Sequence, residues 1–266
     1  MFGDVSKGMD ISLQIIRTLS EFLLVFSIGS GVGWWLEFSY RGIIRKGDFI
    51  NPGFLSGPYL PIYGFGAYFL YLLDGLPLSF LQKVLFFTIA ATLMELFTGL
   101  FFVRFFKIRL WDYSMRKGNI KGQICPLFTF YWMMAGGIGL YLIVPFLKEW
   151  VSLFSERIHL TFFLGLYYGI ILSDVVNSFN MATRLSSIVS GLKEKGRPLV
   201  LDYKKLRRHL RDVQSYIPGR GFLGRFLIPF NNISRHDLED HLDSFIVRLK
   251  EYRIIKKAAS HKEKQP

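Results

Sequence analysis

Five long apolar blocks dominate the sequence and restrict it to one class of fold. They cover residues of about 18–39, 59–76, 84–106, 126–147 and 159–181. Each block has roughly the length that a helix needs to cross the hydrocarbon core of a bilayer, and each carries few charges. Too few amphipathic helices lie outside the blocks to bury them in a soluble protein. The sequence therefore predicts an all-α, polytopic membrane protein with five transmembrane helices in residues 1–181.

The placement of lysine and arginine predicts the orientation of these spans. The connections after the first and third blocks are basic, and the first of them carries Arg41, Arg45 and Lys46. The connection after the second block carries only Lys83. Because cytoplasmic loops of membrane proteins are enriched in basic residues, the basic connections belong in the cytoplasm. We expect a multi-pass protein of the plasma membrane with its N-terminus outside and its C-terminus in the cytoplasm.

Residues 182–266 form a basic tail of different composition, with nineteen lysines and arginines against nine acidic residues. Apolar residues at helical spacing predict one amphipathic helix over about 234–258 and a mostly helical cytoplasmic tail. The tail could lie on anionic lipid, dock a partner protein or bind nucleic acid. Nucleic acid is the least favoured partner because the tail has no zinc-finger spacing and no RNA-binding or helix-turn-helix pattern.

Three carboxylates lie inside the predicted spans, where a charge is costly unless it is partnered or neutralised. Glu37 has a local partner in Arg41, four residues later on the same helix face. Glu95 has no basic residue within a turn, so its partner must come from another helix, a main-chain group or water. Asp174 has Asn177 nearby. Each of these groups could face a transport path or form a structural interhelical hydrogen bond, and the sequence leaves both interpretations open.

The connection after the first block is rich in proline and glycine and reads NPGFLSGPYLPIYGFG over residues 51–66. Proline denies helical hydrogen bonds and glycine permits tight turns, so this segment could be a non-helical, re-entrant stretch or an ordered interfacial turn. The residues that we single out at the predicted cytoplasmic border are Arg41, Asn51, Gly53, Pro58, Pro61, Trp111, Asp112, Tyr113 and Asn119. Trp111 and Tyr113 suit a membrane interface, and Asp112 could pair with Arg109 or Arg116.

The first and third blocks share features that indicate an internal duplication. Both carry a glutamate, and both are followed by a basic connection in which asparagine and proline are separated by six residues, Asn51 to Pro58 and Asn119 to Pro126. Two hairpins with the same orientation would form a parallel repeat.

Several of these segments together resemble a known family. They are GWWLE at 33–37, the Arg41 and Arg45 pair, residues 51–66, MELFTG at 94–99, and RLWDY at 109–113 with Asn119 and Gly122 downstream. Over about residues 22–147 the chain resembles bacterial membrane proteins named type IV ABC transporters, or CmpB-like permeases. That family usually has Asn-Arg-Gly-Phe-Leu where this chain reads NPGFL at 51–55, so one positive charge is missing here.

The resemblance implies a transport subunit of the ABC permease type, with no implied substrate. The chain has no Walker A signature, so a separate ATPase would have to dock on residues 107–121 or on the tail. Five spans are few for a pore, which favours a homo-oligomer. The alternative is a non-transporting scaffold or regulatory protein that recruits a partner through its tail. We expect no enzyme, because the spans carry no HExxH or GxSxG motif, and the sequence predicts no metal site or cofactor.

Overall fold

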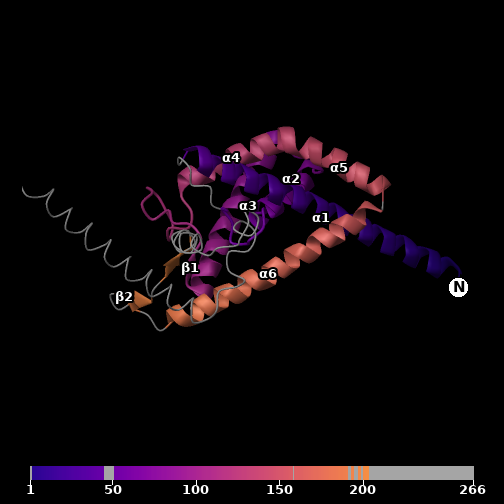
Figure 1. The fold of residues 1–266 in the computed structure, drawn as a ribbon. Helices are drawn as coiled ribbons and strands as arrows, with labels where there is room; N and C mark the ends of the chain where they lie inside the picture. Colours follow the sequence, from indigo (N-terminus) through magenta and orange to yellow (C-terminus); the bar gives the residue numbers. More distant parts are fainter. Residues whose placement is uncertain are drawn as a thin grey trace, which may run out of the picture.

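The computed structural model describes residues 2–44, 51–157, 159–190, 193–194, 197–198 and 200–203. Long helices make up most of these residues (Figure 1). The predicted amphipathic helix at 234–258, most of the tail, and Arg45 and Lys46 lie outside the described residues. The elements are α1 (Phe2–Ile44), α2 (Pro61–Asp74), α3 (Phe80–Phe101), η1 (Phe102–Phe106), β1 (Ile108–Arg109), α4 (Pro126–Ile138), η2 (Gly139–Ile143), α5 (Val144–Glu156), α6 (Leu160–Ser190), β2 (Lys193–Glu194), β3 (Arg197–Pro198) and β4 (Leu201–Asp202).

Four helical stretches in the described residues are long and apolar enough to cross a membrane. They are Gln14–Ile43, Phe80–Phe106, Pro126–Phe154 and Leu160–Ser187. They correspond to the first, third, fourth and fifth apolar blocks of the sequence, so the prediction of a multi-pass helical membrane protein is confirmed. Within the second block, α2 has only 14 residues, a length of about 21 Å against a hydrocarbon core of about 30 Å. A count of five spans therefore stays a prediction.

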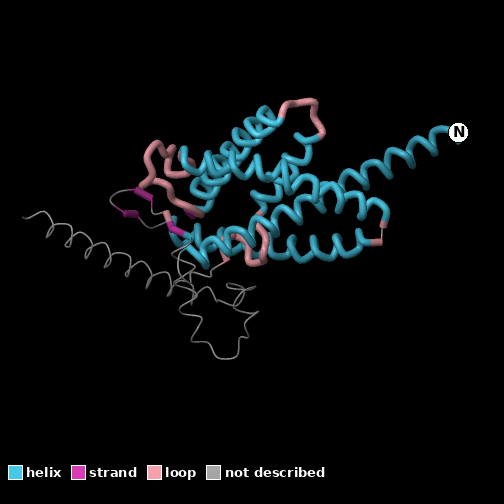
Figure 2. The backbone as a smooth tube through the Cα atoms, turned by 90° about the horizontal axis from the view of Figure 1, so that it is seen from above, coloured by secondary structure: helices cyan, strands magenta, loops and turns pink. Residues whose placement is uncertain are grey.

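Helix α1 packs mainly against α2 and also contacts α5 and α6, whereas α3 packs against α2 and α4. The N-terminal end of α1 projects beyond the other helices in two perpendicular views (Figures 1 and 2). The segments α4, η2 and α5 follow one another as one helical run, and α6 returns after a short turn along another side of the molecule (Figure 1). Tyr168 of α6 reaches α1, where its hydroxyl donates to the carbonyl of Leu23 at 2.7 Å.

The fourth apolar block continues further than its hydropathy predicts. Its helix passes Pro145 and ends at Glu156, beyond the predicted limit at 147. Proline lacks an N–H and its ring displaces the carbonyl four residues earlier. The π-helical turn η2 comes immediately before Val144 and accommodates this break, because a π-bulge changes the hydrogen-bond register without ending a helix.

Glycines bring α1 and α2 into close contact. A Cβ atom placed on Gly29 would lie 2.4 Å from Ala67 Cβ, and one on Gly33 would lie 2.2 Å from the ring of Tyr63. Small residues spaced four apart allow helix backbones to approach in this way. The amide of Leu60 also donates to the carbonyl of Ser30 at 3.0 Å. The start of α2 is therefore fixed beside the middle of the span Gln14–Ile43.

A buried apolar cluster joins α6 to both basic connections. Its buried members are Ile108, Met181, Ala182, Leu185, Val189, Leu201 and Tyr203, with Phe54, Phe106 and Leu110 packed against them. Strand β1 pairs in parallel with β4 through Ile108 and Leu201. We predicted an end of the fifth span at 181, but α6 continues to Ser190. The short strands were also not predicted, because two residues carry no periodicity and their pairing depends on chain segments far apart in sequence.

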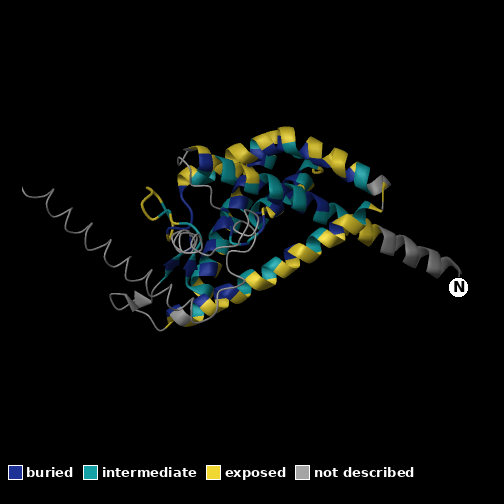
Figure 3. Cartoon of the chain, viewed as in Figure 1, coloured by how far each residue is buried: buried dark blue, intermediate teal, exposed yellow. Residues whose placement is uncertain are grey.

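The outward faces of the long helices are apolar. Large hydrophobic side chains are exposed along α3, α4 and α6. Exposed residues run along α4, α5 and α6 in Figure 3 (yellow). An apolar exterior this extensive is typical of a surface that lipid covers.

Candidate functional site

The carboxylate of Asp174 binds a non-helical loop. This loop, residues 51–60, connects α1 to α2 and lies against α6. Asp174 accepts hydrogen bonds from the amide of Ser56 at 2.9 and 3.1 Å and from the amide of Gly57 at 2.9 Å. The hydroxyls of Tyr59 and Ser178 also donate to it. We call this set of interactions the Asp174 contact.

Asn51 gives the loop its shape. Its side-chain amide nitrogen donates to the main-chain carbonyls of residues 55–57 over 2.7–3.3 Å. Its side-chain oxygen accepts from the amide of Gly53 at 2.9 Å and from the indole N–H of Trp34 at 3.0 Å. Because Trp34 belongs to α1, the same asparagine folds the loop and attaches it to the first span.

The loop is buried at alternate positions although it is neither helix nor strand. Asn51, Gly53, Leu55, Gly57 and Tyr59 are all buried. Irregular backbone at membrane depth is tolerated only where protein or water satisfies its polar groups. Here the side chains of Asn51 and Asp174 supply those partners.

The carboxylate of Glu95 binds two side chains from other parts of the chain. The hydroxyl of Tyr113 donates to Oε1 at 2.9 Å, and the indole N–H of Trp132 donates to Oε2 at 3.0 Å. Glu95 is only 5% exposed. Tyr113 lies in the connection between η1 and α4, and Trp132 lies on α4. We call these interactions the Glu95 contact. Its partners come from outside the helix of Glu95, which agrees with the absence of a local charge in the sequence.

Tyr113 stays protonated in this contact. Burial raises the pKa of the Tyr113 hydroxyl, and the neighbouring carboxylates of Glu95 and Glu37 raise it further. The tyrosine is therefore a permanent hydrogen-bond donor at neutral pH and ties the connection 107–125 to the third span.

Side chains also fold the connection 107–125 into a fixed shape. Asn119 donates to the carbonyls of Ser114 and Arg116 at 3.1 and 2.8 Å and accepts from the amide of Gly122 at 3.0 Å. The indole of Trp111 donates to the carbonyl of Gln123 at 2.9 Å. Trp111 and Asn119, both singled out from the sequence, thus shape this loop.

Asp112 pairs with Arg109, one of the two partners that the sequence allowed. The two side chains are 3.0 Å apart, and the Asp112 carboxylate also accepts from the amide of Ser114 at 3.0 Å. Partial burial would raise the pKa of the Asp112 carboxyl. Hydrogen bonds from Ser114 and the charge of Arg109 outweigh burial, so the pKa lies below its ordinary value.

The two connections share the hydrogen bonds of a central asparagine but differ in the position of the proline at which the next helix begins. Asn51 and Asn119 both accept from the amide of a glycine and donate to main-chain carbonyls of their own loop. The prolines correspond differently from the sequence pattern, because α2 begins at Pro61 and not at Pro58, whereas α4 begins at Pro126. The matching hydrogen bonds of Asn51 and Asn119 support the interpretation of a repeat, in which Pro61 and not Pro58 corresponds to Pro126.

Glu37 and Arg41 form the predicted local ion pair, with 2.6 Å between oxygen and nitrogen. The carboxylates of Glu37 and Glu95 both raise the pKa of the Tyr113 hydroxyl, so these two carboxylates lie in one neighbourhood. No contact in the described part of the chain joins Asp174 to either glutamate. The three predicted carboxylates therefore divide into two groups.

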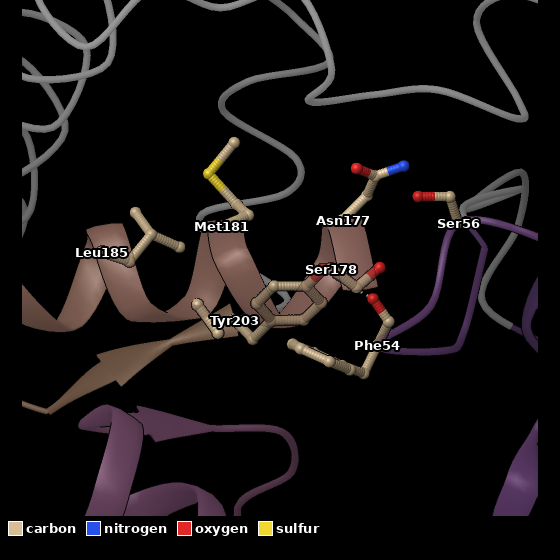
Figure 4. A pocket seen from close by; sticks show the side chains of 8 residues that line it. Phe54, Ser56, Asn177, Ser178, Met181, Leu185 and Tyr203 are labelled. Atoms are coloured by element: carbon tan, nitrogen blue, oxygen red, sulfur yellow. Dashed lines mark hydrogen bonds between the residues drawn. The ribbon is translucent and has the colours of Figure 1, made fainter. Parts of the chain in front are cut away.

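Asn177 does not bind Asp174, although it lies three residues away. Its side chain is exposed and projects from α6 on the side away from Tyr203, at the edge of a small cavity that Phe54, Ser56 and Ser178 also line (Figure 4). The hydroxyl of Tyr203 closes that cavity from the other side and donates to the carbonyl of Phe54 at 3.0 Å.

Sequence reasoning singled out Tyr113 but missed the other donors of the two contacts, which are Ser56, Gly57, Tyr59, Trp132 and Ser178. It also missed Trp34, which donates to Asn51. Main-chain amides such as those of Ser56 and Gly57 leave no signal in residue type. Trp132 is an indole inside an apolar span, and its need for an acceptor could have indicated a buried carboxylate. Within the described residues, no three histidine, cysteine or acidic side chains are grouped so that they could hold a metal ion.

Comparison with protein-family models gives a match. A family model described as "Putative ABC-transporter type IV" matches residues 24–179, more than half of the chain. The matched range contains both contacts and the two loops that Asn51 and Asn119 shape. Comparison with curated proteins and with solved structures gave no significant match.

Proposed function

Because the chain belongs to the family described as "Putative ABC-transporter type IV", we propose that it is the membrane-embedded subunit of an ABC-type transporter that depends on a separate ATPase. The loop 51–60 is the observation that carries this proposal. It is a non-helical segment that begins a short helix beside the middle of the first candidate span. Interrupted segments of this kind often line the substrate path of transporters.

The proposed path lies where the loop meets α6. Asp174 is the candidate polar group at this place, and Glu95 and Glu37 form a second candidate group beside Tyr113. A path that opens and closes requires sets of hydrogen bonds that break together. The Asp174 contact holds the connection before α2, and the Glu95 contact holds the connection before α4. Opening would release one or both connections from the spans.

We propose five membrane crossings with the N-terminus outside and the C-terminus in the cytoplasm. In this arrangement α2 and the loop before it form the second crossing together, since α2 alone has 14 residues. The basic residues at 41–46 and in the connection 107–125 then lie in the cytoplasm, as the positive-inside rule requires. The plasma membrane remains the proposed location.

The connection 107–125 is the proposed docking element for the ATPase. Its tip exposes Met115, which is 95% exposed, beside Arg116 and Lys117. The hydrogen bonds of Asn119 keep the tip rigid, and Tyr113 ties its base to Glu95. A partner bound at the tip would therefore be linked through Tyr113 to the carboxylate of Glu95 inside the membrane. The tail remains a second candidate docking element.

The test is whether this chain controls a nucleotide-hydrolysing partner. The full-length protein is purified in mild detergent and its partner identified by mass spectrometry; the two are then placed in lipid vesicles and ATP hydrolysis is measured. We expect the wild-type chain to stimulate hydrolysis and the Glu95→Gln variant to lose the stimulation. Glu21→Gln, at a carboxylate of α1 with no hydrogen bond in the described residues, is the matched control. A partner without ATPase activity, or full stimulation by Glu95→Gln, would contradict the proposal and favour a scaffold.

A further inference from the structure

Residues 200–203, at the beginning of the tail, are built into the membrane domain. Leu201, in β4, is only 1% exposed, and its amide donates to the carbonyl of Lys107 at 2.9 Å, so that β4 pairs in parallel with β1. Tyr203 is also buried, and both side chains belong to the apolar cluster that α6 forms with β1. We call residues 200–203 the strap. The strap therefore attaches the beginning of the connection 107–125 to the end of α6.

The strap also holds the loop 51–60. The hydroxyl of Tyr203 donates to the carbonyl of Phe54 at 3.0 Å, and the centroids of the two rings are 5.7 Å apart. Ser56, whose amide donates to Asp174, follows two residues after Phe54. One short segment of the tail thus contacts both connections, the second connection through its main chain and the first through a tyrosine side chain.

The small cavity beside the Asp174 contact has the strap as one of its walls. Tyr203 lines it together with Ala182 of α6 (Figure 4). Ser56 and Ser178, which both donate to Asp174, line it as well. Its volume is about 20 Å³, which is room for roughly one water molecule and for nothing larger. A larger molecule can therefore reach the Asp174 contact through this cavity only if one of its walls moves.

The strap is the wall that can move without disturbing the helices. Strands β1 and β4 have two residues each, and so short a ladder is not stable by itself. The strap is therefore held largely by burial of Leu201 and by the hydroxyl of Tyr203. The buried clusters that pack α2 against α3 and α1 against α5 consist of other residues, so they do not depend on the strap.

We propose that the strap controls access to the Asp174 contact: when it lifts, the cavity opens and the loop 51–60 is released from α6. The chain continues from the strap into the basic tail, so a partner that binds the tail acts on both connections at once. The inference rests on the proposed function for the claim that a path lies where the loop meets α6, and it adds the element that regulates this path. Its tests contain no ATPase, so their failure would leave the ATPase test of the proposed function standing.

Thiol labelling of the full-length protein in mild detergent tests the proposal. In a Cys125→Ala background, Ala182→Cys places a cysteine on the cavity wall at a position that is 1% exposed. Leu201→Ala weakens the strap but leaves the ring of Tyr203 in the chain, so a gain in labelling requires the strap to move. We expect a water-soluble maleimide to react about tenfold faster or more when Leu201→Ala is added. Tyr203→Phe should act in the same direction, because it removes the hydroxyl that binds the loop.

Ala91→Cys is the matched control for the reporter cysteine. Ala91 is also 1% exposed, but it lies on α3 in a separate cluster, so its labelling should stay unchanged when Leu201→Ala is added. Unchanged labelling of Ala182→Cys in both strap variants would overturn the proposal. An equal rise at the two reporter cysteines would overturn it as well, since it would show that the substitutions loosen the whole protein and do not lift the strap.

Amide hydrogen exchange in the loop before α2 provides a second readout that needs no cysteine. Leu201→Ala should speed the exchange of the Ser56 and Gly57 amides about tenfold, because the released loop loses their acceptor. Leu147→Ala is the control, since Leu147 is fully buried too but packs in the cluster of α1, α2 and α5. It should leave these amides unchanged. Exchange that responds equally to the two truncations, or to neither, would contradict the control of this contact by the strap.

Discussion

The Asp174 contact and the Glu95 contact both keep a carboxylate inside the protein, but they use different donors. Asp174 accepts from two main-chain amides and two hydroxyls, whereas Glu95 accepts from one hydroxyl and one indole. A hydroxyl can turn from donor to acceptor, and a main-chain N–H cannot. The same substitution should therefore have different consequences at the two places.

Removal of each carboxylate gives the largest expected effect. Asp174→Ala leaves the amides of Ser56 and Gly57 and the hydroxyl of Tyr59 without an acceptor. At about 1–3 kcal/mol for each unsatisfied buried group, we expect a loss of about 3–5 kcal/mol in unfolding free energy. Glu95→Ala leaves two donors unpaired and should lose about 2–4 kcal/mol. Unfolding in mixed micelles of increasing denaturing detergent measures both. An Asp174→Ala protein as stable as the wild type would contradict the main-chain contact.

The neutral amide variants sharpen the comparison. In Glu95→Gln the new oxygen can accept from Trp132 while the new NH₂ group donates to the Tyr113 oxygen, so we expect a loss below about 1 kcal/mol. In Asp174→Asn the side-chain oxygen can keep both amides, but the NH₂ group then replaces the oxygen that lies 3.1 Å from the Ser56 amide, which cannot accept, so the loss should be about 1–3 kcal/mol. The same detergent unfolding assay checks the order. An equal loss in the two variants would show that the amides do not fix Asp174 as described.

Removal of the tyrosine hydroxyls should reverse the order of the two contacts. Tyr113→Phe removes one of only two donors to Glu95, and we expect a loss of about 1–2 kcal/mol. Tyr59→Phe leaves Asp174 with the amides of Ser56 and Gly57, and the loss should stay below about 1 kcal/mol. Thermal unfolding in a mild detergent, with Tyr141→Phe as an exposed control, measures the difference. A larger loss for Tyr59→Phe would mean that the hydroxyl, and not the loop backbone, holds Asp174.

The smallest expected effect concerns the ion pair at the base of the second connection. The pKa of Asp112 is lowered in the folded protein, so its stabilising contribution is present above the ordinary carboxyl pKa of about 3.9 and disappears as the pH falls through the folded-state value. Asp112→Asn should be slightly less stable than the wild type at pH 7, and the two should converge below about pH 4. A difference that grows on acidification would contradict the assigned direction of the pKa shift.

Local signals in the sequence predicted the parts of the site that are local in the structure. Spacing of four residues correctly identified the pair of Glu37 and Arg41. The lack of any charge near Glu95 correctly pointed to partners on other elements. The membrane class followed from block length and composition, because these set what a bilayer can accept.

The missed features depend on contacts between distant segments. The Asp174 contact joins residues that are 118 positions apart, and its main donors are amides that every residue possesses. Asn177 was chosen by proximity in sequence, but the helical turn directs it away from Asp174 while Ser178 points toward it. The close packing of α1 on α2 had a usable signal in the spacing of Gly29 and Gly33, which we did not exploit.

The long separation between loop 51–60 and Asp174 has a consequence for biosynthesis. The loop leaves the ribosome 118 residues before the carboxylate that completes it. At a synthesis rate of about 5–20 residues per second, the loop waits about 6–24 s with its amides unpaired by Asp174. During this interval the nascent chain presents unsatisfied backbone at the membrane, where chaperones or proteases of the insertion machinery can recognise it. Chains truncated before α6 should therefore be degraded quickly, whatever the stability of their first spans.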